Sequence, residues 1–159
     1  MDNSLSASAQ KVQAALQQLG MTLQVVELPD TTRSAADAAQ AIGCGVEQIA
    51  KSLVFRSKQT QRPILIIASG TNRVNEKRIG ELLGEPIEKA DADFVRQKTG
   101  FAIGGVPPVG HTEQPAVFID EDLLHYDEIW AAAGTPHAVF RLLPADLVTM
   151  TNGHVVAIK

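Results

Sequence analysis

Apolar residues recur at helical spacing in the first part of the chain and gather in short continuous runs later on. Val12, Leu16 and Leu19 form one apolar stripe of a helix that we expect to stop at Gly20. Further helices are predicted where a capping residue precedes the pattern and a glycine follows it. They span residues 34–42, 75–83 and 91–98, and the predicted caps are Ser6 or Ser8, Ser34, Asn75 and Asp91.

Strands are predicted where β-branched and apolar residues lie between turn signals. The run 63–68 is continuously apolar, as expected of a strand buried on both faces. Asn152-Gly153 predicts a tight hairpin between 149–151 and 154–158. The other predicted strands are 22–28, 51–56, 116–120, 129–133 and 137–142, with helical turns at 46–50 and 144–147. Helices alternate with strands early and strands dominate late, which predicts an α/β fold with a mixed, partly antiparallel sheet packed with helices.

Composition limits the class of protein. The 159 residues are 45% hydrophobic and 20% charged, which is typical of one globular domain and argues against disorder. No apolar run approaches a membrane span, and residues 1–4 lack the basic start of a signal peptide. The single cysteine, Cys44, cannot form an internal disulfide. We therefore expect one domain over residues 1–159, in the cytoplasm, with no membrane partner.

Charge is distributed unevenly along the chain. Residues 51–98 hold ten Lys and Arg against six Asp and Glu, a local charge of +4. Residues 99–140 hold six acidic residues and no Lys or Arg, a local charge of −6. The basic segment is suited to a phosphate backbone, or it is a mixture of solvated charges on helix faces.

The segment 99–111 is the most informative stretch for function. It contains four glycines and the adjacent Pro107 and Pro108. Glycine allows a ligand to approach the main chain closely, and proline stiffens the loop. Unobstructed N–H groups on such a loop are suited to binding an anion or a developing oxyanion.

The familiar catalytic motifs are absent from the sequence. No Gly-Lys-Ser/Thr follows the glycine loop, and no Gly-x-Ser-x-Gly nucleophile elbow exists. Gly43-Cys-Gly45 begins like a dinucleotide fingerprint, but Gln48 occupies the third glycine position. The four histidines show no metal-ligand spacing. Cys44 is either a nucleophile or a small residue at a helix end. These observations argue against a standard triad and against a metallohydrolase.

Several blocks together resemble one known family. Residues 39–43 (Ala-Gln-Ala-Ile-Gly) and 49–54 (Ile-Ala-Lys-Ser-Leu-Val) are similar to its alanine-rich helix, glycine, lysine and apolar strand. Residues 99–110 resemble its Thr-Gly-aromatic, Gly-Gly, Pro, Gly signature. Residues 132–134, leading to 143–147, resemble its C-terminal pattern. On these blocks the chain is identified as a member of the YbaK and prolyl-tRNA synthetase editing-domain family, over about residue 10 to the end.

The resemblance implies a barrel-like mixed sheet surrounded by helices, and hydrolysis of the ester between a wrong amino acid and tRNA. The substrate it implies is mischarged tRNA, often tRNA for proline, with an aminoacyl-tRNA synthetase as a further candidate partner. The pocket of a synthetase rejects smaller amino acids by only roughly 10–200-fold per methylene, so a separate site is needed to hydrolyse the wrongly charged products. No metal and no organic cofactor is implied. Attack by a positioned water, assisted by the neighbouring ribose hydroxyl, fits the absence of an evident nucleophile.

The resemblance also assigns residues. It implies that Lys51 anchors a phosphate or ribose of the tRNA 3′ end, and that the amides of Gly104 and Gly105 hold the scissile carbonyl. His137 is the fourth candidate catalytic residue, to shape the pocket or position water. The candidate substrate-binding residues are Ser52, Pro108, Gly110, His111, Gly134 and Thr135. Strand alternation by itself points Ser52 away from the face of Lys51.

Two other functions remain open at this point. A non-catalytic tRNA- or nucleotide-binding module would show salt-sensitive binding without ester cleavage. An esterase acting on small aminoacyl esters would not be inhibited by free tRNA.

Overall fold

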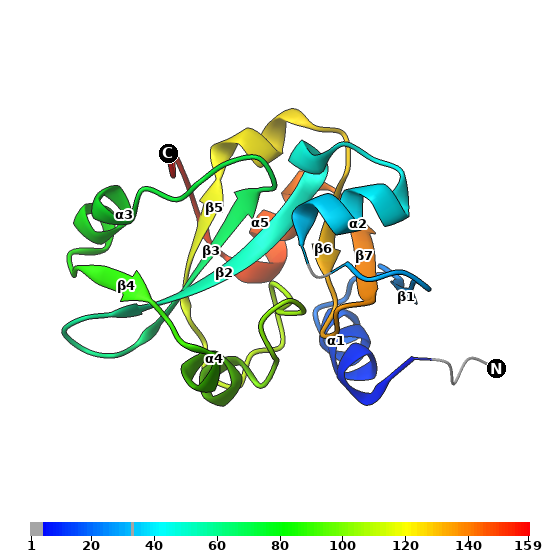
Figure 1. The fold of residues 1–159 in the computed structure, drawn as a ribbon, viewed down its shortest axis with the longest axis horizontal. Coiled ribbons are helices and arrows are strands. Elements are labelled where there is room, and N and C mark those ends of the chain that lie inside the picture. The colour runs from blue at the N-terminus through cyan, green and yellow to red at the C-terminus, as the bar shows by residue number, and fades with distance from the viewer. Residues whose placement is uncertain (1–4, 33) are drawn as a thin grey trace.

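The computed structural model describes residues 5–32 and 34–159, whose strands form one mixed sheet (Figure 1). The strand order is β1-β7-β6-β2-β3-β5-β8, and β4 pairs with β2 outside this path. The strands are β1 (Val25–Glu27), β2 (Ile49–Ser57), β3 (Pro63–Ser69), β4 (Ile87–Lys89), β5 (Ala116–Asp120), β6 (Ile129–Ala132), β7 (Ala138–Leu142) and β8 (His154–Val156).

Both parallel and antiparallel pairs occur in this sheet. β2 and β3 form a long antiparallel pair, whereas β2 with β6, β3 with β5 and β5 with β8 are parallel. The predicted α/β fold with a mixed, partly antiparallel sheet is confirmed. β3 is buried along all seven of its residues, as its continuous apolar run predicts.

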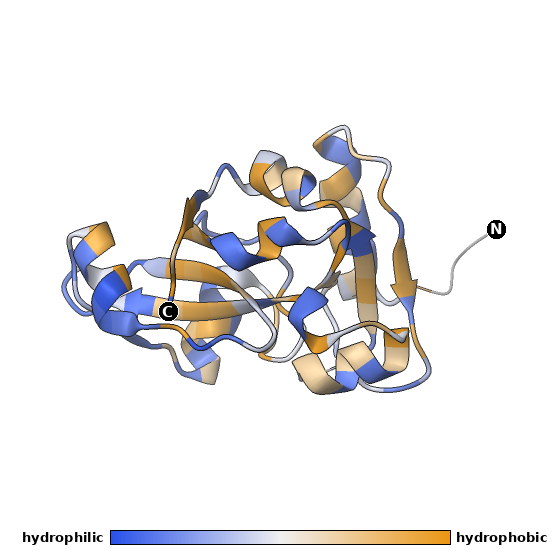
Figure 2. Cartoon of the chain, turned by 90° about the horizontal axis from the view of Figure 1, so that it is seen from above, coloured by the Kyte–Doolittle hydropathy of each residue, from blue (hydrophilic) through white to orange (hydrophobic). Residues whose placement is uncertain are grey.

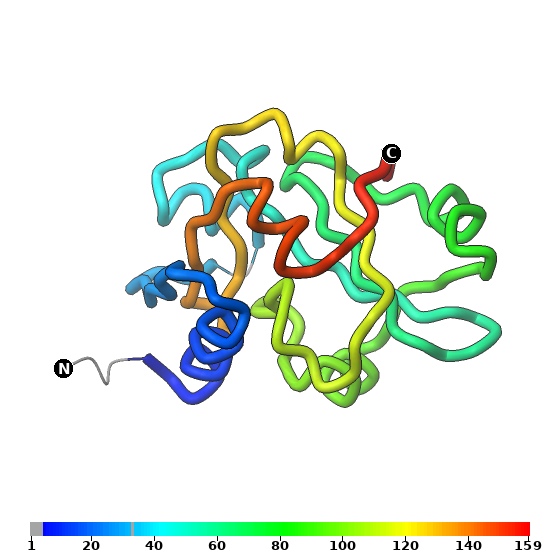
Figure 3. Tube along the Cα trace, turned by 180° about the vertical axis from the view of Figure 1, so that it is seen from behind, coloured from blue at the N-terminus to red at the C-terminus, as the bar shows by residue number. Residues whose placement is uncertain are grey.

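Helices pack on both faces of the sheet. α2 lies in front of β6 and β7 in Figure 1, and α5 lies on the opposite face, which Figure 3 shows from behind. The helices are α1 (Ala7–Gln18), α2 (Ala35–Ile42), α3 (Glu76–Leu83), α4 (Ala92–Thr99) and α5 (Pro144–Thr151), with 3-10 turns η1 (Val46–Gln48) and η2 (Glu121–His125). Hydrophobic residues follow the central strands, and hydrophilic ones occupy much of the helix surface (Figure 2).

The predicted helix boundaries rest on local hydrogen bonds, and the structure confirms them. The side chains of Ser6, Ser34, Asn75 and Asp91 each accept a hydrogen bond from a backbone N–H in the first turn. Gly43, Gly84 and Gly100 end their helices in the left-handed conformation. Such a C-cap favours glycine, because a Cβ is strained there.

The predicted hairpin at Asn152-Gly153 is wrong. Residues 149–151 belong to α5, and Asn152 caps this helix in the left-handed conformation, with φ 53°. The Thr151 hydroxyl donates to the Leu147 carbonyl at 2.8 Å, and the Gly153 N–H donates back to that hydroxyl at 3.1 Å. The following strand, β8, pairs in parallel with β5. An αL asparagine therefore ends a helix here instead of turning a hairpin.

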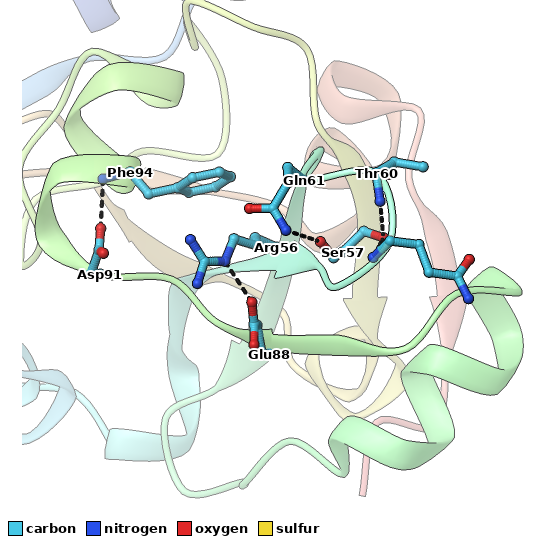
Figure 4. Close-up of polar contacts among 8 residues, drawn as sticks. Arg56, Ser57, Thr60, Gln61, Glu88, Asp91 and Phe94 are labelled. Atoms are coloured by element: carbon cyan, nitrogen blue, oxygen red, sulfur yellow. Dashed lines mark hydrogen bonds and ion pairs between the residues drawn. The ribbon is translucent and has the colours of Figure 1, made fainter.

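β4 has no counterpart among the predicted strands, and β1 is shorter than predicted. Ion pairing and helix capping fix β4 beside β2 (Figure 4). Arg56 Nε lies 2.7 Å from Glu88 Oε2, and the Arg56 guanidinium lies 5.6 Å from the centre of the Phe94 ring. Asp91, which caps α4 two residues after the end of β4, accepts from the Phe94 N–H at 2.9 Å. These contacts join β2, β4 and α4 into one unit.

Candidate functional site

A cleft opens along one edge of β2. This edge pairs with β6 only at Ile49 and Ala50, and with β4 only from Phe55 onward. Among the described strands, none pairs with the edge between Ala50 and Phe55. Two adjoining cavities, of about 280 and 560 Å³, occupy this gap. Both cavities are lined by Lys51, Ser52, Leu53, Ile103, Gly104 and Val106.

The smaller cavity is lined mainly by small and apolar side chains. Its walls come from α2, β2, β6 and the 103–106 loop, and include Ala35, Ala38, Ile49, Ala131, Ala132 and Val139. Thr32 Oγ1, Ser52 Oγ and Trp130 Nε1 belong to residues that line this cavity, and each of these atoms is buried with no hydrogen-bond partner among residues 5–32 and 34–159. Buried polar atoms are normally paired. Three polar groups of this wall therefore lack the pairing that buried polar atoms normally have among the described residues.

The larger cavity is basic. Lys51, Arg73 and Lys89 line it, together with Asn72 and the single carboxylate of Glu76. None of the three cations forms an ion pair with a carboxylate in the described part of the chain. Unpaired cations that share one cavity repel one another, so an anionic group bound there would be stabilised.

Lys51 lies where the two cavities meet. It pairs with Ala68 across β2 and β3, and its ammonium donates to the Gly70 carbonyl at 3.4 Å. Burial lowers the pKa of Lys51 below its ordinary value, Arg73 lowers it further, and Asp120 opposes both effects. The predicted Lys51 thus lies in the cleft, and Ser52 lines both cavities beside it despite strand alternation.

The glycine loop forms the opposite wall. The Gly105 N–H donates to the Ala102 carbonyl at 3.1 Å, and Gly104 adopts φ +98°, as at the third residue of a type II turn. The N–H groups of Gly104 and Val106 donate to no acceptor among the described residues. Of the two predicted amides, Gly104 has a free N–H at the cleft, whereas the N–H of Gly105 is occupied inside the turn.

The loop is joined to the turn that follows β6. The Gly134 N–H donates to the Gly105 carbonyl at 2.8 Å, and a Cβ on Gly105 would lie 2.8 Å from backbone atoms of Thr135. The structure therefore brings together Gly104, Gly105, Gly134 and Thr135, as predicted from their pattern. Gly134 and Thr135 do not line either cavity.

His137 lies away from the cleft. Its side chain is exposed, its Nδ1 lies 3.2 Å from the Asp30 carbonyl, and its N–H donates to Thr135 Oγ1. It lines neither cavity and is not placed beside Lys51. Its geometry fixes the turn against the segment that precedes α2.

Pro108, Gly110 and His111 lie behind the loop. None of them lines either cavity. His111 Nε2 lies 2.6 Å from the Pro107 carbonyl, and the imidazole centre lies 6.3 Å from that of Phe101. Burial lowers the pKa of His111, the charge of Lys11 lowers it further, and the Pro107 carbonyl opposes the shift. A neutral His111 thus holds the loop closed from behind.

Several cleft residues were not predicted from the sequence. Asn72 and Arg73 lie in the turn that follows β3, so a polar pair shortly after a buried strand is the signal that could have indicated them. Lys89 belongs to the unpredicted β4. Thr32, Ile103 and Trp130 carry no comparable local signal, because only the tertiary fold brings them to the cleft.

Over residues 5–32 and 34–159, no group of three or more His, Cys, Asp and Glu side chains is arranged to hold a metal ion. No helix in the same part of the chain is long and apolar enough to cross a membrane.

Comparison with known proteins decides the family. Residues 29–150 match the aminoacyl-tRNA editing domain family. The chain belongs to this family. The predicted YbaK and prolyl-tRNA synthetase editing-domain membership is thus confirmed.

Individual relatives of this editing-domain protein cover most of its length. YwhH of Bacillus subtilis, an uncharacterized protein, is 32% identical over 77% of this chain and 78% of its own. EbsC of Enterococcus faecalis, a candidate Cys-tRNA(Pro)/Cys-tRNA(Cys) deacylase, is 26% identical over 76% of this chain and 73% of its own. A crystal structure of a candidate trans-editing enzyme for prolyl-tRNA synthetase matches with a TM-score of 0.93 and 49% identity, over 98% of this chain and 99% of that one.

Proposed function

We propose that this protein is a trans-editing deacylase that hydrolyses the ester of mischarged tRNA, with tRNA for proline as the carrier. Family membership supports an aminoacyl-tRNA substrate. The relatives whose names mention proline tRNA or prolyl-tRNA synthetase support the choice of tRNA.

The position of Lys51 between two unlike cavities is the observation that carries this proposal. The cavity on one side of Lys51 is small and largely apolar, and the cavity on the other side is basic. An aminoacylated tRNA end has the same division, because a small amino acid is joined by an ester to a nucleotide with phosphates. We therefore place the acyl group in the smaller cavity and the terminal nucleotide in the basic one. The ester then lies near Lys51 and Gly104.

The chemistry requires positioning more than a nucleophile. Water adds to the ester carbonyl carbon, and the negative charge develops on the carbonyl oxygen. The free N–H groups of Gly104 and Val106 are suited to that oxyanion, and the Lys51 ammonium anchors a ribose or phosphate oxygen. The tetrahedral intermediate then expels the ribose oxygen, which leaves with a proton. The products are the free amino acid and tRNA with both terminal hydroxyls restored.

In this mechanism the other predicted residues support the loop. Gly105 provides room for the backbone of Thr135, and its carbonyl binds Gly134. Pro108, Gly110 and His111 brace the loop from behind. His137 and Thr135 fix the turn, and Ser52 lines the cavity that we assign to the acyl group.

A panel of mischarged tRNAs tests the proposal. Ala, Cys, Ser and Thr are each placed on tRNA for proline and on their own tRNAs, and release of the amino acid is measured. The proposal predicts release from at least one mischarged proline tRNA, faster than from the correctly charged one. Salt-sensitive tRNA binding without release would instead indicate a binding module. Hydrolysis of small aminoacyl esters that free tRNA does not inhibit would indicate a small-molecule esterase.

A further inference from the structure

We propose that Asp120, which lines neither cavity, is a positioning residue that holds the Lys51 ammonium in place through the turn after β3. Its part in catalysis rests on the proposed deacylase function. Its effect on Lys51 is a property of the folded protein alone.

Asp120 ends β5 and is 1% exposed. One carboxylate oxygen accepts from the Ser69 N–H at 3.0 Å and from Asn72 Nδ2 at 2.7 Å. The other oxygen accepts from the Asp122 N–H at 2.9 Å. It forms no ion pair with a cation of the described residues. Burying a carboxylate costs free energy unless hydrogen-bond donors surround it. Here the turn after β3 supplies donors to Asp120, and the same hydrogen bonds fix the turn.

The turn is fixed from two sides. The Asn72 N–H donates to the Ser69 carbonyl at 2.9 Å, and Ser69 Oγ donates to the Glu47 carbonyl at 2.7 Å. A Cβ on Gly70 would clash with the Val46 carbonyl oxygen, so the backbone lies tightly against η1. The turn supplies the Gly70 carbonyl that binds the Lys51 ammonium, and it carries Asn72 and Arg73 into the basic cavity.

The carboxylate also acts on Lys51 through its charge. The charged groups around the lysine are Arg73 after β3, Glu76 on α3, Lys89 on β4 and Asp120 on β5. Burial and Arg73 lower the pKa of Lys51, and Asp120 raises it. Asp120 therefore helps to keep a half-buried lysine protonated beside a second cation, which an anion-binding role requires.

Asp120→Asn is the direct test, because the side chain keeps its shape but loses its charge. In the wild type, hydrogen-bond donors meet both oxygens of the carboxylate. The amide of the variant has only one acceptor oxygen, so one set of donors loses its partner. We expect the pKa of Lys51, followed by NMR of its ε-methylene group without substrate, to fall in the variant. We expect deacylation at pH 7.5 to fall by about 10-fold or more through kcat, as misplacement of a binding group does. The alkaline limb of the pH profile should move to lower pH.

Asp122→Asn is the matched control. Asp122 also accepts from Asn72 Nδ2, at 2.8 Å, but it pairs with Lys159 near the surface. We expect it to leave the titration of Lys51 and the pH profile unchanged. An unchanged Lys51 titration in Asp120→Asn, or an equal change in both variants, would overturn the proposal. Since the NMR readout needs no substrate, it separates this outcome from a failure of the proposed deacylase function.

Asn72→Ala tests the positioning even if Asp120→Asn does not fold. It removes the side-chain bond from the turn to the carboxylate and leaves the buried charge in place. Deacylation should fall while the Lys51 titration moves less than in a charge-removing variant. Deacylation at the wild-type rate by folded Asn72→Ala would contradict the role given to the turn.

Discussion

Gly105 is needed for space rather than for an unusual backbone angle. A Cβ at this position would lie 2.8 Å from the N, Cα and C atoms of Thr135. Those are backbone atoms, which cannot rotate away as the end of a side chain can. Gly104, in contrast, has φ +98°, which strains any residue with a side chain. Two adjacent glycines thus meet two different requirements of the same loop.

We expect Gly105→Ala to destabilise the fold by about 1–3 kcal/mol, because the added methyl group forces the loop and the 133–137 turn apart. Deacylation should fall with it, since Gly104 moves. Thermal unfolding measures the stability. Gly45→Ala is the control, because the three atoms nearest to a Cβ there belong to the flexible Glu47 side chain. Equal stability of wild type and Gly105→Ala would refute the close packing.

His111 should make stability depend on pH. Its pKa is lowered in the folded state, so the unfolded chain binds the proton more readily. The contribution of His111 to the free energy of unfolding should therefore be fully present above the unfolded pKa of about 6.5, and it should decrease as pH drops below that value. We expect His111→Gln to be less stable by about 1 kcal/mol at pH 8 from the altered hydrogen bond to Pro107. Between pH 7 and 5.5 the free energy of unfolding of His111→Gln, measured by urea unfolding, should fall less than that of wild type. The same dependence on pH in both proteins would contradict this role of His111.

At the scale of elements, the sequence signals that succeeded are local. A capping side chain and a closing glycine act within one helical turn. The ends of α2, α3 and α4 are therefore determined by residues close to them in the sequence. The hairpin prediction failed because Asn-Gly satisfies two different structures. In both, asparagine adopts the left-handed conformation, and only the preceding residues decide whether a helix or a strand ends there.

Asn152 offers a test of that helix end. Asn152→Gly should keep or slightly raise stability, because glycine takes φ 53° without strain. Asn152→Ala should cost about 1 kcal/mol, since the Cβ is strained there and the side chain cannot compensate. Chemical denaturation of both variants measures the difference. Alanine as stable as glycine would show that the left-handed cap is not maintained.

At the scale of the whole molecule, the sequence predicts the parts of the site but not its cavities. The family blocks predicted Lys51, Ser52 and the Gly104-Gly105 turn, which lie at the cleft. The resemblance also assigned His111 and His137, which lie outside the cleft. The gap beside β2 depends on where β6 stops and β4 begins, and these pairings join segments far apart in the chain. No periodicity or motif encodes such a gap.

The basic segment shows how the fold divides like charges. Three of its cations form ion pairs with acidic groups: Arg56 with Glu88, Arg62 with Glu85 and Lys98 with Glu113. Lys51, Arg73 and Lys89 are instead gathered in one cavity. The fold therefore separates ion-paired cations from three that share a cavity, and the phosphate-binding role that we propose concerns only the latter. That separation cannot be deduced from the charge count, because it depends on which strands become neighbours.

The central claim is that the Lys51 ammonium anchors a ribose or phosphate oxygen of the tRNA 3′ end and so positions the ester between the two cavities. Single-turnover deacylation by Lys51→Ala tests it most directly, with the best substrate of the mischarged panel and with folding checked by thermal unfolding. We expect the rate to fall by about 100-fold or more, as misplacement of a bound substrate does, while the melting temperature stays near that of wild type. A folded Lys51→Ala protein that clears the amino acid at the wild-type rate would contradict the account.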